Sequence, residues 1–333
     1  MAALTHRRAE ELLTSVRSVR AVVIGDLMVD RYISGVVERV SPEAPVPVVR
    51  VEEERAAIGG AGNVAANIAA LGAACSVVGC VGDDADGRAL RDAFDARGID
   101  VSGVILTDDR PTTVKTRVMA RHQQIVRFDR EGDADVPADV GARLAEAVQT
   151  ATTIADTVVL EDYNKGVLTP AVIRAALDAA REHAVPSVVD PKRRNFFEFS
   201  GATVFKPNAK ELGDALGSFV HPDDARWMAA TWERLHCDHL LLTLGERGMA
   251  LHAKGAGHIR VPTVARSVYD VSGAGDTVTA LVATVLAAGG NPMEAAVIAN
   301  HAAAVEVGKA GVATVTAEEI LDHIKAHPTQ RST

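Results

Sequence analysis

The chain has 333 residues, 47% of them apolar and 24% charged, so it can bury a large core and is neither disordered nor of low complexity. Thirty-five Lys and Arg stand against 44 Asp and Glu, and the net charge of -9 argues against nucleic acid or an anionic membrane as the main partner. Three cysteines without a CxxC pair are not the pattern of a secreted disulfide domain, so we expect a cytoplasmic protein.

Residues 1–20 predict a short amphipathic helix, because they lack the continuous apolar core of a signal peptide. Beyond them, short β-branched runs alternate with alanine-rich stretches, among them AVVIGD, NVAANIAALG, CSVVGCVG, GRALRDAFDARG, TVVLED, HLLLTLG and GDTVTALVATVLAAGG. This alternation is typical of a parallel sheet covered by helices. No apolar stretch is long enough to span a bilayer. The sequence predicts an α/β fold with a mostly parallel central sheet flanked by helices.

Two stretches break the alternation. Residues 31–56 contain three prolines in SPEAPVPVV between β-rich flanks, and residues 112–130 have strand periodicity without a helix. We expect them to form a small β lid that projects from the main sheet. Since no internal repeat or flexible linker separates these parts, we expect a single domain over residues 1–333.

The clearest chemical motif is DVSGAGD at residues 270–276, which leads into a long apolar helix. Gly273, Ala274 and Gly275 allow backbone amides to approach an anion at the helix N-terminus, where the partial positive charge favours a phosphate. A carboxylate at Asp276 could then take a proton from an attacking hydroxyl group. The alternative is that Asp276 only caps the helix.

A second motif, VFKPNAKE, ends a predicted strand and opens a helix with Asn208 and Glu211 three residues apart. Such a pair can hold the water shell of magnesium beside phosphates, but the same spacing is also a capping box. The strand HLLLT is followed by Gly245 and Gly248 at the edge of the sheet where open α/β folds bind ligands. A left-handed turn explains these two glycines equally well.

Near the N-terminus, Gly60, Gly62 and Asn63 open a helix, and Asp30 follows the first strand. Carboxylate and amide oxygens of this kind accept hydrogen bonds from sugar hydroxyls, although a lone Asp30 is also typical of a solvated loop. The segment GAGNVA further matches the loose dinucleotide pattern GxGxxA, which makes a nicotinamide-dependent oxidoreductase an alternative. The charged residues before it count against a buried strand there, and no GxxxxGK[ST] motif indicates a P-loop enzyme.

From about Val22 to about Val315, the chain resembles the ribokinase-like (PfkB) family of carbohydrate kinases. The motifs that carry the resemblance occur in the family's order: GDLMVDRY, GGAGNVAAN, KPNAKE, LLTLGERGM and DVSGAGD. The resemblance implies that Asp276 is the base that activates a sugar hydroxyl and that Asn208 and Glu211 help to place magnesium and the phosphates of ATP. A catalytically silent sugar sensor on this fold is disfavoured because Asp276 is intact.

The resemblance also implies roles for further residues. Asp30, Gly60, Gly62 and Asn63 match sugar-binding positions, and Asp270 and Ser272 match positions that border a monovalent-cation site, such as one for K⁺, in some members. The usual Asp-Thr start of that motif is Asp-Val here, which leaves cation activation open. The positions that match the nucleotide site are Lys206, Asn208, Thr243, Gly245, Gly248 and Asn300.

Within the family, the segments SPEAPVPVV, KTRVMARHQQIVRFDRE, EDYNKGVL and DPKRRNF most resemble members that act on D-glycero-β-D-manno-heptose 7-phosphate. Those members phosphorylate its C1 hydroxyl to give the 1,7-bisphosphate on the way to ADP-heptose and lipopolysaccharide. Cations near the expected sugar site suit a phosphorylated substrate, and we expect Arg117, Lys165, Lys192 and Arg193, with Lys115 and Arg121 nearby, to supply them. A kinase for another sugar or sugar phosphate remains the alternative.

In some bacteria the related kinase is fused to a nucleotidyltransferase domain with an HxGH signature. That motif is absent from this sequence, so we expect the kinase domain without a nucleotidyltransferase domain. The β lid pairs two subunits in related kinases, and an exposed lid has sheet edges that need covering. We therefore expect a homodimer that forms through the lid.

Overall fold

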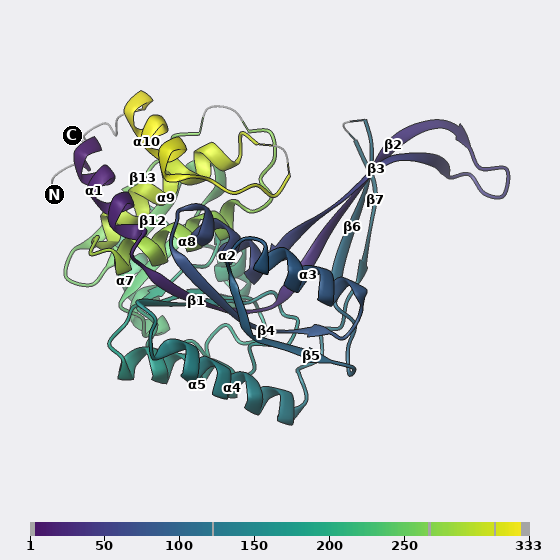
Figure 1. Ribbon diagram of the computed structural model, residues 1–333. Coiled ribbons are helices and arrows are strands. Elements are labelled where there is room, and N and C mark those ends of the chain that lie inside the picture. Colours follow the sequence, from purple (N-terminus) through teal and green to yellow (C-terminus); the bar gives the residue numbers. More distant parts are fainter. Residues whose placement is uncertain (1–3, 122, 266–267, 310, 328–333) are drawn as a thin grey trace.

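The computed structural model describes residues 4–121, 123–265, 268–309 and 311–327 (Figure 1). Among these residues the larger sheet has nine strands in the order β13-β12-β11-β10-β9-β8-β1-β4-β5, parallel except at β12 and β13. Its inner strands β1, β8 and β9 are almost entirely buried, because helices cover both faces, as their apolar runs predict. The bounds of the strands in this sheet are β1 Arg20–Gly25, β4 Ala74–Gly82, β5 Asp100–Thr107, β8 Thr157–Glu161, β9 Ser187–Asp190, β10 Val204–Phe205, β11 His239–Thr243, β12 Met249–Ala253 and β13 Gly257–Val261.

The helices bury two separate apolar cores, one against each face of this sheet. Helices α1, α2, α8, α9 and α10 contribute to one core, and α4, α5, α6 and α7 to the other. The expected α/β architecture is therefore confirmed. The helices are α1 His6–Val16, α2 Ala61–Ala70, α3 Ala85–Asp95, α4 Ala138–Thr152, α5 Pro170–Glu182, α6 Ala209–Leu216, α7 Ala225–Leu235, α8 Ala274–Ala287, α9 Pro292–Glu306 and α10 Ala317–Ala326, with a 3₁₀ turn at Gly245–Arg247.

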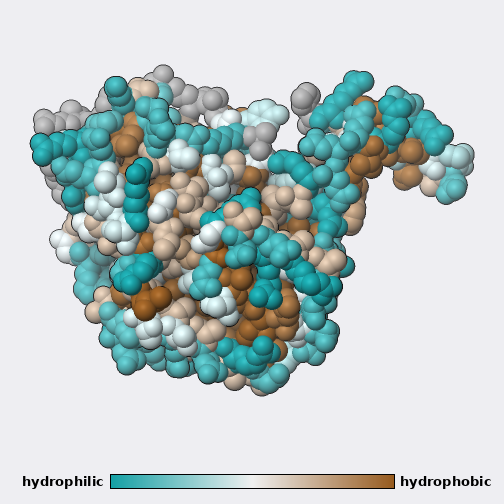
Figure 2. All heavy atoms as spheres, viewed as in Figure 1, coloured by the Kyte–Doolittle hydropathy of each residue, from teal (hydrophilic) through white to brown (hydrophobic). Residues whose placement is uncertain are grey.

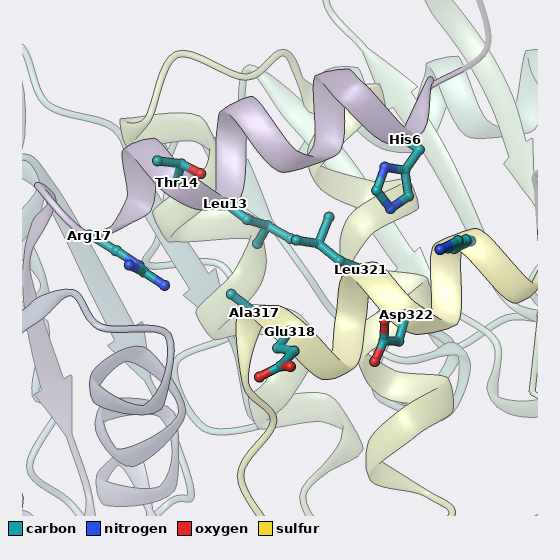
Figure 3. A pocket seen from close by; sticks show the side chains of 9 residues that line it. His6, Leu13, Thr14, Arg17, Ala317, Glu318, Leu321 and Asp322 are labelled. Atoms are coloured by element: carbon teal, nitrogen blue, oxygen red, sulfur yellow. The ribbon is translucent and has the colours of Figure 1, made fainter.

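The N-terminal helix predicted from the sequence is α1, which packs beside α10. It buries Leu12 and Leu13 and exposes its charged side, as its apolar spacing predicts. A groove of about 420 Å³ lies between the two helices. Figure 3 shows Leu13 and Leu321 between the helices and charged side chains such as Arg17, Glu318 and Asp322 around them. Among the described residues, none of the helices has the length and apolarity needed to cross a bilayer.

The lid is a second sheet of the order β3-β2-β6-β7 that projects from one end of the molecule (Figure 1). Its strands are β2 Leu27–Val40, β3 Pro47–Gly60, β6 Thr113–Ala120 and β7 Gln123–Arg130. The sheet is mixed, because β2 pairs antiparallel with β3 but parallel with β6. Strand β2 follows β1 with only Asp26 between them. Asp30 is consequently a buried strand residue rather than a loop residue.

Candidate active site

The candidate site lies at the carboxyl edge of the central sheet, where open α/β sheets hold ligands. The N-termini of α2 and α8 reach the same edge, because both helices pack on one face of the sheet. Five neighbouring strands present a polar residue at this edge. Strands β8, β9 and β11 end in Glu161, Asp190 and Thr243, and strands β1 and β10 are followed by Asp26 and Lys206.

Asp276 is the third residue of α8 and is only 6% exposed. Its Oδ1 accepts a hydrogen bond of 2.7 Å from the Tyr163 hydroxyl, and its Oδ2 accepts one of 2.7 Å from Asn63 Nδ2. The helix cap is Gly273, with φ of 97°, so the interpretation of Asp276 as a cap alone is wrong. The carboxylate is instead held between two donors that come from different elements.

Burial raises the pKa of Asp276 to about 6, and the hydrogen bonds from Asn63 and Tyr163 oppose that rise. Desolvation disfavours the charged carboxylate, whereas both donors favour it. A carboxylate with this pKa is mostly ionised at neutral pH and still binds a proton more readily than an ordinary Asp. These are the properties that a general base requires.

Tyr163 lies in the loop after β8 and was not among the residues expected from the sequence. Its backbone N–H donates to Asp26 Oδ2 at 2.8 Å, and the N–H groups of Lys165 and Val167 donate to the same carboxylate at 2.9 and 3.1 Å. Asp26 follows β1, which pairs in parallel with β8. The sequence feature that could have identified Tyr163 is the presence of polar residues at the ends of β1 (Asp26) and of β8 (the segment EDY that contains Tyr163), because these two strands are neighbours in the sheet.

The backbone at the start of α8, where the sequence predicts an anion site, packs closely against Asn63 and lies near Lys206. A Cβ at Gly273 would lie 2.9 Å from Asn63 Nδ2, so a larger residue there would displace Asn63 from Asp276. A Cβ at Gly275 would lie 3.9 Å from Lys206 Nζ. Lys206, which is 2% exposed and paired with Asp190, therefore lies beside the start of α8, and a helix N-terminus favours an anion.

A buried ion-pair network extends from Lys206 to α6. Lys206 Nζ lies 2.7 Å from Asp190 Oδ2, and Lys192 Nζ lies 3.3 Å from Asp190 and 2.6 Å from Glu211. Glu161 is fully buried beside them, and its pKa is well above the usual range because of burial and the charge of Asp190. Asp190 is the counter-ion of both Lys192 and Lys206.

Asn208 and Glu211 form a capping box at the start of α6. Asn208 Oδ1 accepts from the Glu211 N–H, and Glu211 Oε2 accepts from the Asn208 N–H, both at 2.8 Å. Since Lys192 occupies the other carboxylate oxygen, Glu211 links the cap to the lysine network. The capping function is observed, and it does not remove the expectation of a role beside phosphates.

The residues expected to bind sugar lie on both sides of the site. Asn63 contacts Asp276, whereas Asp30 forms an ion pair with Arg117 across the lid. Lys165 pairs with Glu131 at 2.7 Å. The structure therefore places Asn63 against Asp276 and pairs Asp30 with Arg117. Arg193 is exposed and makes no hydrogen bond or ion pair with any described residue.

The residues expected to bind nucleotide surround the ends of β11 and β13. Thr243 forms a β-bridge with Asn208, and the 3₁₀ turn between Gly245 and Gly248 follows it. Asn300 donates from its side chain to the Pro262 carbonyl at 2.8 Å. Asp270 accepts from the Ser272 N–H at 2.9 Å, which shapes the turn before the predicted anion site.

The GxGxxA pattern at residues 60–65 has the wrong context for a dinucleotide fingerprint. It opens α2, as expected, but the preceding strand β3 belongs to the lid and pairs antiparallel with β2. A dinucleotide site requires a parallel βαβ unit whose first strand lies in the main sheet. The oxidoreductase alternative therefore has no structural support.

Replacing Tyr163 by Phe should move the acid limb of the kcat/KM profile to higher pH by about one unit. A base with a pKa of about 6 becomes inactive as the pH falls through that value. Loss of the Tyr163 hydrogen bond removes a donor that favours the ionised form, so protonation occurs at higher pH. The measurement is kcat/KM from pH 5 to 9, and Tyr32→Phe, which removes a hydroxyl from the lid, should leave the limb in place.

The sequence matches the pfkB family carbohydrate kinase over residues 19–319. Two curated relatives are each named "Bifunctional protein HldE". The one from Pelobacter propionicus is 45% identical over 323 residues, which cover 96% of this chain and 66% of the relative. The one from Azorhizobium caulinodans is 47% identical over 312 residues, which cover 93% and 65%. The chain thus spans about two thirds of the length of these relatives.

Solved structures show the same fold at low sequence identity. Arabidopsis thaliana ribokinase complexed with ribose and ATP has a TM-score of 0.73 and 22% identity, covering 92% of this chain and 99% of that chain. Phosphofructokinase-2 from Escherichia coli in complex with potassium has a TM-score of 0.77 and 19% identity, covering 93% and 98%. The ribokinase-like fold expected from the sequence is confirmed, and the chain belongs to the pfkB family of carbohydrate kinases.

Proposed function

We propose that this carbohydrate kinase transfers the γ-phosphoryl group of ATP to the C1 hydroxyl of D-glycero-β-D-manno-heptose 7-phosphate, giving the 1,7-bisphosphate in ADP-heptose synthesis for lipopolysaccharide. The observation that carries the proposal is the buried carboxylate of Asp276, which lies between two donors at the N-terminus of α8. Phosphoryl transfer depends on positioning and charge stabilisation. In this proposal, Asn63 and Tyr163 position the base, and the N-terminus of α8 stabilises the charge.

In the proposed reaction, one oxygen of Asp276 accepts the proton of the C1 hydroxyl as the sugar oxygen attacks the γ-phosphorus. The O–H bond breaks, the new O–P bond forms, and the bond to the bridging oxygen breaks, so that ADP leaves with the electron pair. Amides of Gly273, Ala274 and Gly275 and the Lys206 ammonium stabilise the negative charge on the transferring group. The Tyr163 and Asn63 donors hold the base in place.

We place ATP beside β11, with Thr243, Gly245, Gly248 and Asn300 at its border and Lys206 and Asn208 toward its phosphates. The described residues include no cluster of three or more His, Cys, Asp or Glu side chains arranged to hold a metal. This fits a magnesium ion that arrives on the nucleotide and keeps most of its water, with Glu211 and Asn208 as outer contacts. Bound there, magnesium would neutralise phosphate charge.

A monovalent cation beside Asp270 and Ser272 is a further part of the proposal. Glu306 of α9 is fully buried, and neither carboxylate oxygen has a hydrogen-bond partner among the described residues. Burial and the charges of Asp270 and Asp276 raise the pKa of Glu306 to about 8. A buried carboxylate without a hydrogen-bond partner would be stabilised by a cation bound beside it, which supports a cation site near Asp270 and Ser272.

The heptose 7-phosphate assignment rests on the segments of the lid and of the loops after β8 and β9 that resemble kinases for this sugar. An ADP-release assay over heptose 7-phosphate, fructose 6-phosphate, ribose, fructose and adenosine tests the assignment, with phosphorus NMR to detect a new anomeric phosphate. Turnover of another sugar phosphate without turnover of heptose 7-phosphate would favour the alternative, a family kinase for a different sugar.

We further propose that two chains pair through the lid. Its outer strands β3 and β7 have free edges, and apolar side chains are exposed along it (Figure 2), including Val40, Val51, Val126 and Phe128. Sedimentation equilibrium should return twice the chain mass of 34.9 kDa. Phe128→Glu should weaken the dimer, and a wild-type protein that sediments as a monomer at micromolar concentration contradicts the proposal.

A further inference from the structure

Charged side chains gather where the lid and the loop after β8 face the candidate site. Four are cations and three are carboxylates. Asp30, Lys115, Arg117, Arg127 and Asp129 lie on one face of the lid by their alternation along β2, β6 and β7, while Glu131 and Lys165 lie in the adjoining loops. Among the described residues the carboxylates are all paired, in Arg117–Asp30, Arg127–Asp129 at 2.6 Å and Lys165–Glu131 at 2.7 Å. The fourth cation, Lys115, is left without a counter-ion.

Lys115 lies in the middle of β6 and is half-buried. It is directly opposite Asp30 on β2 and Asp129 on β7, but it makes no hydrogen bond or ion pair with any described residue. Burial lowers its pKa, Asp30 and Glu131 raise it, and Lys165 and Arg127 lower it further. Such an ammonium has lost part of its water without gaining an anion, which is unfavourable until an anion binds.

The Tyr163 ring fixes the position of Lys115 relative to the base. Lys115 Nζ lies 5.1 Å from the centroid of this ring, and the hydroxyl of the same ring donates to Asp276. The ammonium and the carboxylate are therefore separated by little more than one tyrosine side chain. A sugar whose anomeric hydroxyl contacts Asp276 can present a terminal phosphate at this distance.

We propose that Lys115 binds the terminal phosphate of the sugar substrate and is the residue that distinguishes phosphorylated from free sugars. The inference deepens the proposed function and rests on it only in requiring a sugar phosphate as acceptor. Arg117 and Lys165 would have to give up a carboxylate to bind phosphate, so the gain is offset by the lost ion pair. Lys115 has no ion pair to lose, and a bound phosphate would offset the unfavourable free energy of its partial burial.

The test is Lys115→Met, which keeps an unbranched side chain one atom shorter and removes the charge. KM for heptose 7-phosphate should rise about 10- to 100-fold, the equivalent of one charge-assisted contact, with little change in kcat. Turnover of free heptose should not change. Calorimetric binding of heptose 7-phosphate without ATP should weaken by the same factor. Lys115→Arg should restore most of the preference, and Arg39→Met, which removes an exposed lid cation, should behave as wild type.

Two results would overturn the inference. An equal loss on phosphorylated and free sugar would mean that Lys115 acts on the transferring phosphoryl group. A loss of discrimination in Arg117→Met or Lys165→Met but not in Lys115→Met would assign the phosphate to the paired cations. Failure of the heptose assignment is distinguishable, because the wild type would then turn over a different sugar phosphate, and the same comparison would be made with that compound and its free sugar.

Discussion

Asp276→Asn should lower kcat by about 10²- to 10⁴-fold, which is the range expected when proton transfer to a positioned base is lost. The amide keeps the shape of the carboxylate and one acceptor oxygen, so Asn63 or Tyr163 retains a partner. It has no appreciable basicity, and the C1 hydroxyl must then lose its proton to water. The effect should fall on kcat, since neither substrate binds through the transferred proton.

The measurement is steady-state ADP release with saturating ATP and sugar phosphate. Binding of ATP with magnesium, followed as the rise in melting temperature, should be nearly unchanged, which separates loss of chemistry from loss of folding. Asp214→Asn, an exposed carboxylate on α6, is the matched control and should keep wild-type turnover. Near-normal activity in Asp276→Asn would show that another group takes the proton.

The second large effect concerns the substrate. Heptose 7-phosphate should exceed free heptose in kcat/KM by about 10- to 100-fold, because the charge-assisted contact with Lys115, of about 1.5 to 3 kcal/mol, is available only to the phosphate. The difference should appear mainly in KM, as for Lys115→Met, because the remote phosphate contributes binding energy to the ground state and the transition state alike. Comparable kcat/KM values for the two compounds would contradict a phosphate subsite.

The fold followed from patterns that act locally. Apolar runs bounded by glycine and proline predicted the strands, and the spacing of Asn208 and Glu211 predicted the start of α6. Asp276 was identifiable because its own motif contains both the glycines and the carboxylate. In each case the residues that determine the structure are neighbours in sequence, so the sequence pattern suffices.

Tyr163 and Lys115 could not be found in this way. The importance of Tyr163 depends on a contact with Asp276 across 113 positions of the chain. Lys115 differs from Arg117 and Lys165 only because those two side chains already have carboxylate partners. The strand register between β2, β6 and β7 determines which charged side chains on the lid can form ion pairs. A list of cations in sequence does not show which of them remains unneutralised.

Two register shifts in the pairing of β2 with β3 separate an inner from an outer part of the lid. They lie at Ser34/Gly35 and Val37/Arg39, well beyond Asp30, and bulges are where a strand bends most easily. Inward of them, β2 is continuous with β1 through Asp26, which also holds the loop of Tyr163. Bending of the outer hairpin, as in the proposed dimer, can therefore be absorbed before it reaches the inner half of the lid. In the proposed function, the distance between this inner half and Asp276 would then stay constant and would limit the length of the sugar acceptor.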